Sequence, residues 1–180
     1  MDVISAIKKR SSCRDFKKTQ IKNEDLNLLM DAALASPTAI NLQDLKINVV
    51  QDANLIHDIS QECFRLMDEK VKKRMQDRKA DSIFYNAPTV FILSSPKTIY
   101  SDLNAGIVAQ SLCIAAESLG LASCIIGMAA PAFAKTNPNN LKNRLDMADD
   151  ECFCVSVAIG YANSKKLPHE FNYNQIRGFF

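Results

Sequence analysis

The chain has 180 residues, of which 47% are hydrophobic and 23% charged, and 22 Lys and Arg residues nearly balance 20 Asp and Glu residues. This length fits one domain, so we expect residues 1–180 to form a single unit with the composition of an ordinary globular protein. A net charge of +2 argues against a disordered chain and against a basic arm for nucleic acid, which we do not expect as a partner.

The first two predicted helices begin at polar capping residues. Asp2 caps a helix whose apolar residues share one face, and a basic, polar cluster follows it. Those apolar residues are Val3, Ile4 and Ile7. Asn23 caps a second helix, which Pro37 stops.

Four short β-branched runs bounded by turn signals are predicted to be strands, and they span residues 45–51, 89–94, 124–128 and 153–159. In the last run apolar and small residues alternate, so both faces of the strand are expected to be buried away from water. The apolar face is predicted to contain Phe153, Val155, Val157 and Ile159. We therefore expect an α+β domain with helices on both sides of the sheet.

A charged segment, residues 57–82, lies between the first two strands, and its apolar residues have the spacing of one or two surface helices. Its basic run from Lys70 to Arg74 has two interpretations. It is either a solvated helix face, which the near-neutral total charge favours, or a docking patch for an acidic partner.

The longest predicted helix spans Ser101 to Leu119, with Ser101 as its cap and Gly120 as its stop. It is apolar on most sides and rich in small residues. Such a helix is either a central core helix or one that lies at a subunit interface, where small residues permit close approach.

Glycines and cysteines restrict the chemistry. The five glycines lie too far apart for G-x-G-x-x-G or a phosphate-binding P-loop. If the chain binds a nucleotide, it does so through a site without a glycine-rich loop. The six cysteines include no C-x-x-C, which favours buried, reduced thiols over a redox pair or metal site. Neither His57 nor His169 has partners at zinc-site spacing. With no signal sequence and no stretch of about 20 apolar residues, we expect a cytoplasmic protein without a membrane partner or a metal.

Three polar clusters are candidates for a binding site. Residues 10–14 (RSSCR) supply two guanidinium groups and two hydroxyls, which either bind a phosphate monoester or complement the end of the first helix. Residues 36–43 form a polar loop. At residues 125–127 a glycine at a strand end lets the backbone approach a flat ligand closely.

In this order, five segments resemble the nitroreductase family of FMN-dependent oxidoreductases over nearly the whole chain. They are Ile7–Phe16 (IKKRSSCRDF), Ala32–Gln43 (AALASPTAINLQ), Asn86–Leu93 (NAPTVFIL), Asp102–Gly127 and Val157–Ala162 (VAIGYA). The resemblance implies a mixed, mainly antiparallel central sheet covered by helices on both faces, and a homodimer with FMN at the subunit interface. One departure is Asp44-Leu45, where many members have Pro-Trp; this chain has no tryptophan.

The resemblance also assigns flavin contacts to residues. A strip after the first helix holds the phosphate and the pyrimidine side of the ring: Arg10, Ser11, Ser12 and Arg14. A loop of the other subunit covers the flavin: Pro37, Thr38, Ala39 and Asn41. Backbone N–H groups of Ile126 and Gly127 lie near flavin N5, and Lys165 and Lys166 supply a C-terminal cation for the phosphate.

The implied activity is transfer of hydride from NADH or NADPH to flavin N5, followed by reduction of a nitroaromatic, a quinone or a similar electron-poor small molecule in a ping-pong mechanism. The flavin carries this chemistry, so no catalytic side chain is expected. Two alternatives remain: a flavin-binding or flavin-modifying protein of the same fold without true nitroreductase activity, and a structural dimer that has lost its flavin.

Overall fold

A computed structural model describes residues 1–164 and 166–179 of the chain. Its elements follow the order α, α, β, α, α, β, α, β, β, with short 3₁₀ turns between some of them. The helices are α1 (Val3–Lys9), α2 (Asn23–Leu34), α3 (Ala53–Leu66), α4 (Glu69–Asp77) and α5 (Ser101–Ser118). The strands are β1 (Lys46–Val50), β2 (Thr89–Pro96), β3 (Ala122–Ile126) and β4 (Glu151–Gly160). The 3₁₀ turns are η1 (Ala39–Asn41), η2 (Ala130–Phe133), η3 (Lys142–Leu145) and η4 (Tyr173–Gln175).

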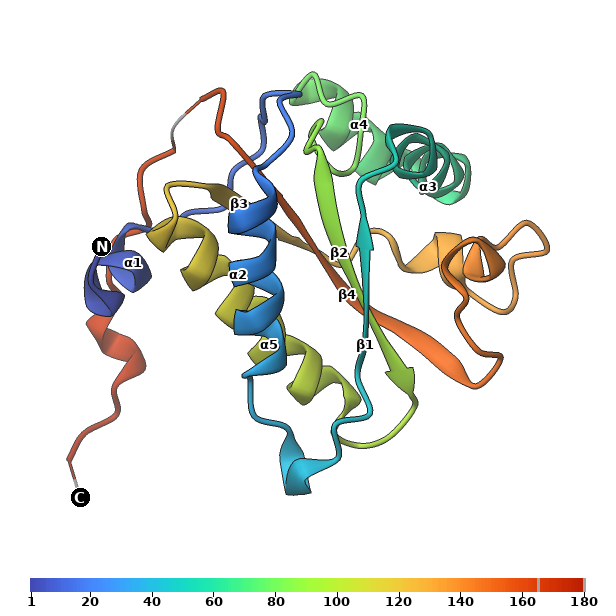
Figure 1. The fold of residues 1–180 in the computed structure, drawn as a ribbon. Coiled ribbons are helices and arrows are strands. Elements are labelled where there is room, and N and C mark those ends of the chain that lie inside the picture. Colours follow the sequence, from blue (N-terminus) through green and yellow to red (C-terminus); the bar gives the residue numbers. More distant parts are fainter. Residues whose placement is uncertain (165, 180) are drawn as a thin grey trace.

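The four strands form one antiparallel sheet in the order β1-β2-β4-β3 (Figure 1). Helices α2 and α5 cover one face, where their apolar side chains pack on Phe91, Leu93 and Val157. Helix α3 and turn η2 cover the other face, where they pack around Val90 and Ile92. Helices on both faces of a mainly antiparallel sheet confirm the α+β fold that the sequence predicts.

The predicted boundaries hold to within a few residues, but two caps are wrong. The N-cap of α2 is Lys22, one residue before the expected Asn23, and it makes no side-chain capping bond. The N-cap of α5 is Tyr100. The Ser101 hydroxyl instead donates to the Pro96 carbonyl at 3.0 Å and accepts from the Thr98 N–H at 2.8 Å, because it closes the turn that leads into the helix.

The predicted alternation along β4 fails at Phe153. The register between β2 and β4 shifts between Leu93 and Ser94, which pair with Val155 and Phe153, so Cys154 is an extra residue opposite the break. Such an irregularity moves the following side chain to the other face of the sheet. Phe153 therefore stacks on Phe133 of η2, with ring centroids 5.5 Å apart, rather than lying beside Val157.

Helix α5 is buried on one side only. Its inner face packs against α2 and the sheet, while Leu103 is 56% exposed and Gly106 and Gln110 are also exposed. A β-carbon added to Gly106 would meet no atom of this chain within 4 Å. Gly120, with φ of 75°, ends the helix as expected. The outward face of α5 thus leaves room for close approach by another molecule.

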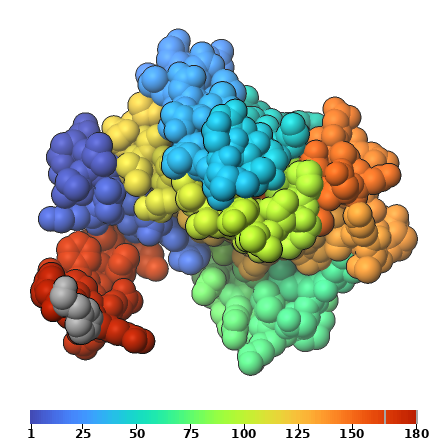
Figure 2. All heavy atoms as spheres, turned by 90° about the horizontal axis from the view of Figure 1, so that it is seen from below, coloured from blue at the N-terminus to red at the C-terminus, as the bar shows by residue number. Residues whose placement is uncertain are grey.

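The two ends of the chain lie side by side at one edge (Figures 1 and 2). Helix α1 keeps only Ala6 buried, and its apolar residues Val3, Ile4 and Ile7 are exposed. The C-terminal tail also exposes large apolar side chains, including Leu167 and Phe171. Within the described residues, no helix is long and apolar enough to cross a membrane.

Candidate flavin site

The segment after α1, residues 10–16, is called the strip here, and it lies in an extended conformation beside the sheet. Ser12 forms a parallel bridge with Ser123 of β3, and the Cys13 N–H donates to the Ser123 carbonyl at 2.9 Å. Phe16 forms an antiparallel bridge with Ala162, just beyond β4. Because one neighbour of the strip lies in β3 and the other directly follows β4, the residues between the two bridges have a defined position in the fold.

A cavity of about 570 Å³ opens beside this strip. Its walls come from the strip, the turn after α4, the segment before β2 and the chain after β4. The lining residues are Ser12, Cys13, Arg14, Asp15, Arg78, Lys79, Ala80, Asp81, Tyr85, Asn86, Ser164 and Lys166. Four cations and two carboxylates thus surround one hollow, which gives it a net positive charge.

The two carboxylates in this cavity are held by amides. Asn163 donates to the Asp15 carboxylate at 3.2 Å, and Asn86 donates to Asp81 at 3.3 Å. The ion pairs among the described residues lie elsewhere and include none of the four cavity cations. An anionic ligand therefore meets cations that need not first give up a carboxylate partner.

A second hollow of about 350 Å³ adjoins the first and shares Cys13, Ser164 and Lys166 with it. The Ser11 hydroxyl lines it and donates to the Lys166 carbonyl at 2.8 Å, which ties the C-terminal segment to the strip. On the strip itself, the Arg10 guanidinium donates to the Ser12 hydroxyl at 3.5 Å. The structure thus brings the predicted strip residues together with Lys166, whereas Lys165 lies outside the described residues.

The thiols near the strip are unsuited to act as nucleophiles. All six cysteines are free, and Cys13, Cys63, Cys113 and Cys124 are buried, as the sequence predicts for inert thiols. Burial raises the pKa of Cys13 and raises the pKa of Cys124 to about 11. Both thiols are therefore neutral near pH 7. The described residues also contain no group of three or more His, Cys, Asp or Glu side chains placed to hold a metal ion.

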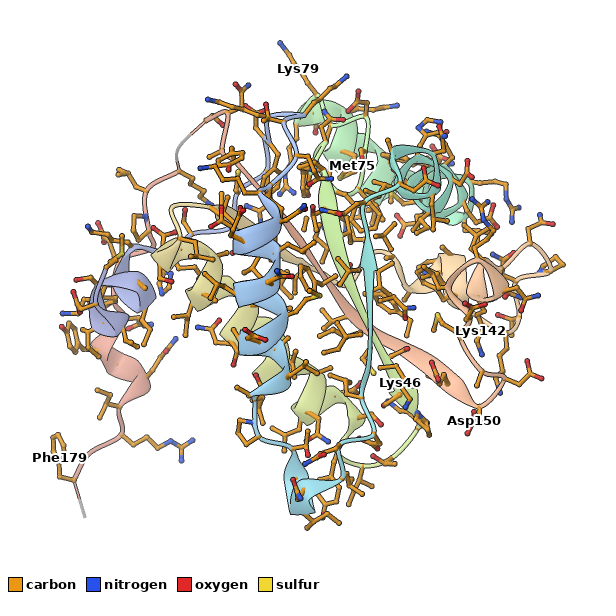
Figure 3. The ribbon with its side chains drawn as sticks, viewed as in Figure 1. Lys46, Met75, Lys79, Lys142, Asp150 and Phe179 are labelled. Atoms are coloured by element: carbon orange, nitrogen blue, oxygen red, sulfur yellow. The ribbon has the colours of Figure 1, made fainter. Side chains whose placement is uncertain are left out.

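The predicted flavin-covering loop lies at the far end of the domain (Figures 1 and 3). It connects α2 to β1, and the Ala39 N–H donates to Oδ1 of Asn104 in the first turn of α5 at 2.9 Å. Three of its residues, Ile40, Asn41 and Gln43, have φ between 48° and 54°. This left-handed conformation is strained for residues other than glycine, so the loop is held by its contacts.

Two buried polar atoms next to this loop have no hydrogen-bond partner among the described residues, Nδ2 of Asn104 and Oδ1 of Asp44. Asn104 is fully buried and uses only its oxygen. Asp44 stands where the resemblance leads one to expect proline. An unpartnered buried amide or carboxylate costs free energy. The hydrogen-bonding groups at this end of the domain are therefore not all paired within the described residues of the single chain.

Ile126 and Gly127 close the third predicted cluster at the end of β3. The Ile126 side chain is buried, and its carbonyl accepts a hydrogen bond from the Ser156 hydroxyl at 2.7 Å. Gly127 is exposed, and an added β-carbon would meet nothing within 4 Å. The backbone there is accessible to a flat ligand, although neither residue lines the two hollows beside the strip.

Among the lining residues that were not predicted from the sequence are Arg78, Lys79, Tyr85 and Asn86. They come from the charged middle segment and the approach to β2. A pair of basic residues after the last apolar position of α4 is the only local signal for them. Their proximity to Arg14 depends on tertiary packing, which no local pattern encodes.

Comparison with known proteins gives one family. The chain matches the Nitroreductase family over residues 7–161, most of its 180 residues. No protein of curated function matches it.

Several solved structures share the fold along their full length. A nitroreductase with bound FMN from Desulfitobacterium hafniense DCB-2 is 28% identical, with a TM-score of 0.91 over 98% of this chain and 97% of that one. A nitroreductase with bound FMN from Bacteroides fragilis NCTC 9343 is 22% identical, with a TM-score of 0.86 over the same shares. An FMN-dependent nitroreductase from Clostridium difficile R20291 is 25% identical, with a TM-score of 0.78 over 96% of each chain.

Proposed function

Since this chain belongs to the nitroreductase family, we propose that it is an FMN-dependent oxidoreductase that takes hydride from NADH or NADPH and reduces an electron-poor acceptor, such as a nitroaromatic or a quinone, in separate half-reactions. The observation that carries the proposal is the cavity beside the strip, whose four cations have no ion-pair partner among the described residues. The solved relatives with bound FMN support the same cofactor here.

The donors around the cavity suit FMN. A phosphate dianion placed between Arg14 and Lys166 receives charge-assisted hydrogen bonds, and the Ser12 hydroxyl also lines the cavity. Arg10 is not a lining residue, but its guanidinium donates to the Ser12 hydroxyl. Charge-assisted hydrogen bonds contribute about 1.5–3 kcal/mol each, so several of them retain a nucleotide without a glycine-rich loop. The exposed backbone at Gly127 leaves room for the edge of a flat ring.

When bound, FMN supplies the redox chemistry by accepting a hydride from a reduced nicotinamide and passing electrons to the acceptor. The chain binds and orients the reactants and shapes the electrostatics around them. The cations beside the strip favour anionic species in the cavity. Neither of the two histidines is among the residues that line this cavity.

We further propose that the active form is a homodimer, because one chain cannot complete this site. The loop at Thr38–Asn41 contacts the first turn of α5, whereas the strip lies beyond the other end of the helix (Figure 1). The 18 residues of α5 span about 27 Å at about 1.5 Å per residue. A loop that covers the flavin therefore has to come from a second copy.

The outward face of α5 suits that contact. Leu103, Gly106, Ile107 and Ile114 are exposed or half-buried on it. Small and apolar residues there allow the backbones of two helices to approach closely and bury apolar surface.

The visible spectrum tests the cofactor. Protein purified with added FMN and freed of unbound flavin is expected to be yellow, with about one flavin per chain. A preparation that stays colourless under these conditions contradicts the proposal. Anaerobic mixing with NADH and with NADPH then tests the activity, since at least one of them is expected to bleach the oxidised flavin rapidly.

A second candidate is a protein that holds FMN without turning it over. The observation in its favour is Asp44, which has a buried, unpartnered carboxylate oxygen next to the loop expected to cover the flavin. Yellow protein whose flavin neither donor bleaches favours this candidate over the oxidoreductase.

A further inference from the structure

The cavity beside the strip has more cations than one FMN phosphate requires. Arg14 and Lys166 lie on the strip and on the C-terminal segment that Ser11 ties to it, and together they account for one phosphate. Arg78 and Lys79 also line this cavity, from the turn that follows α4. The cavity carboxylates, Asp15 and Asp81, are held by amides rather than by these cations.

The turn that carries this second pair is held firmly by the fold. The Lys79 N–H donates to the Gln76 carbonyl at 2.8 Å, and the Ala80 N–H donates to the Met75 carbonyl at 3.0 Å. The Met75 side chain is 1% exposed and anchors the end of α4 in the core. Lys79 has φ of 52°, a left-handed position that glycine usually occupies after a helix. The backbone positions of both residues are therefore defined.

Both side chains line the cavity and also reach solvent. Arg78 and Lys79 are exposed, and Lys79 extends away from the body of the protein at the top of Figure 3. They suit a group at the outer end of a ligand that enters the cavity. The two possible donors differ at such a place, because NADPH carries a 2′-phosphate on its adenosine and NADH has a hydroxyl there.

We propose that Arg78 and Lys79 bind the adenosine 2′-phosphate of NADPH, so that NADPH is the preferred donor. This inference deepens the proposed function and rests on it. A dianionic phosphate gains charge-assisted hydrogen bonds from two cations, whereas a hydroxyl gains little from them. Because both side chains are exposed and partly screened by salt, we expect a preference of about tenfold rather than several hundredfold.

The test uses fragments of the donor and measures binding alone. Flavin-loaded protein is titrated in a calorimeter with adenosine 2′,5′-bisphosphate and with adenosine 5′-monophosphate, which differ in the 2′-phosphate. The bisphosphate is expected to bind about tenfold more tightly, and the preference should shrink as salt is added. In the Arg78→Gln/Lys79→Gln variant, titrated after it has been loaded with FMN, the two fragments are expected to bind within about twofold of each other.

A matched control removes two positive charges from α4 itself, just before the turn that carries Arg78 and Lys79. Lys70 and Lys73 are exposed on α4 and do not line the cavity. The Lys70→Gln/Lys73→Gln variant is expected to keep the preference. Equal binding of the two fragments by the unmodified protein, or an equal loss of preference in both variants, overturns the inference.

The remaining outcomes are also decisive. If Arg78 and Lys79 serve only to complement the negative end of α4, their variant melts at a lower temperature and keeps the fragment preference, which contradicts the inference. Failure of the proposed function looks different, because the protein is then colourless, or its flavin is bleached by neither donor, whatever the fragments do.

Discussion

The two ends of α5 carry ligand-binding segments of different construction. Near its C-terminal end, the strip of residues 10–16 is joined to β3 and to the chain beyond β4, and it borders a cavity whose cations have no acidic partner within the described residues. At its N-terminal end, the loop around Ala39 rests on Asn104, contains left-handed residues and leaves two polar atoms unsatisfied. At one end, the preformed end, the fold already forms a positively charged cavity, whereas at the other, the strained end, polar side-chain atoms still lack hydrogen-bond partners among the described residues.

This difference indicates how the proposed site is divided between two chains. On the proposal above, the preformed end is the one that binds the charged part of the cofactor, where binding needs fixed donors. On the same proposal, the strained end is the one that covers the flavin of a second copy, and its unsatisfied polar groups are available to that copy. Substitutions at the two ends should therefore have different effects on flavin binding and stability. They are compared below with one substitution between the ends and one at neither end.

The largest effect is expected at the preformed end, from Arg14→Ala. Removing a guanidinium from the phosphate site loses one or more charge-assisted hydrogen bonds, so the FMN dissociation constant should rise about 10- to 100-fold. Fluorescence titration of flavin into apoprotein measures it. Arg74→Ala is the control, since Arg74 is exposed on α4 and does not line the cavity. Equal affinities for the Arg14 variant and the unmodified chain would place the phosphate elsewhere.

The next effect tests the surface between the two ends. Gly106→Leu adds a side chain where this chain alone has free space, so the monomer should fold normally. A partner that packs closely there is pushed away, and sedimentation should show a dimer weakened at least about tenfold, with flavin lost in parallel. Gln76→Leu on the exposed face of α4 is the control. A fully dimeric Gly106 variant with bound flavin would refute the role of this face.

A smaller effect is expected at the strained end, from Asn104→Ala. The change removes the acceptor for the half-buried Ala39 N–H, a hydrogen bond that contributes about 0.5–1.5 kcal/mol. Both the unfolding free energy and the flavin affinity should fall, since the loop loses its support. Loss of stability with unchanged flavin affinity would mean that the loop does not reach the cofactor.

The smallest effect is expected from a region at neither end. Glu62 on α3 accepts hydrogen bonds from Arg65 and Asn137, and the Arg65 guanidinium, followed by the Asn137 amide, holds the pKa of the Glu62 carboxyl below its ordinary value. The stability it contributes is therefore present above the unfolded pKa and is lost as the pH falls through the lower folded pKa.

Glu62→Gln should accordingly lower the melting temperature slightly at pH 7 and lose this effect as the pH falls and the carboxyl of the unmodified chain is protonated. Thermal denaturation as a function of pH measures this. Flavin content should be unchanged at neutral pH, and a change would show that distant parts of the fold control the site.

How much of this was predictable depends on the range of the interactions. The strip could be predicted because Arg10, Ser12 and Arg14 lie within five residues of one another. The strands could be predicted because a run of β-branched residues is a local pattern in the sequence. Arg78 and Lys79 could not, because burial of Met75 and the packing of α4 bring their turn to the strip. The side of the sheet on which Phe153 lies could not be predicted either, because it depends on a register shift between two strands.

The open face of α5 lies between these cases. The sequence indicates an unusually apolar helix with small residues, but it does not distinguish a core helix from an interface helix. The single chain favours the second interpretation, because Leu103 and Gly106 remain exposed after the fold is complete.

The division of the site between two chains can be tested most directly by mixing defective subunits. One variant, Arg14→Ala, has a damaged strip and an intact loop; the other, Thr38→Ala/Asn41→Ala, has an intact strip and a damaged loop. In a mixed dimer one site combines the intact strip with the intact loop, so refolding the two together should restore tight flavin binding to about half of the sites of the mixed dimers. Mixtures that bind no more flavin than either variant alone would contradict the account.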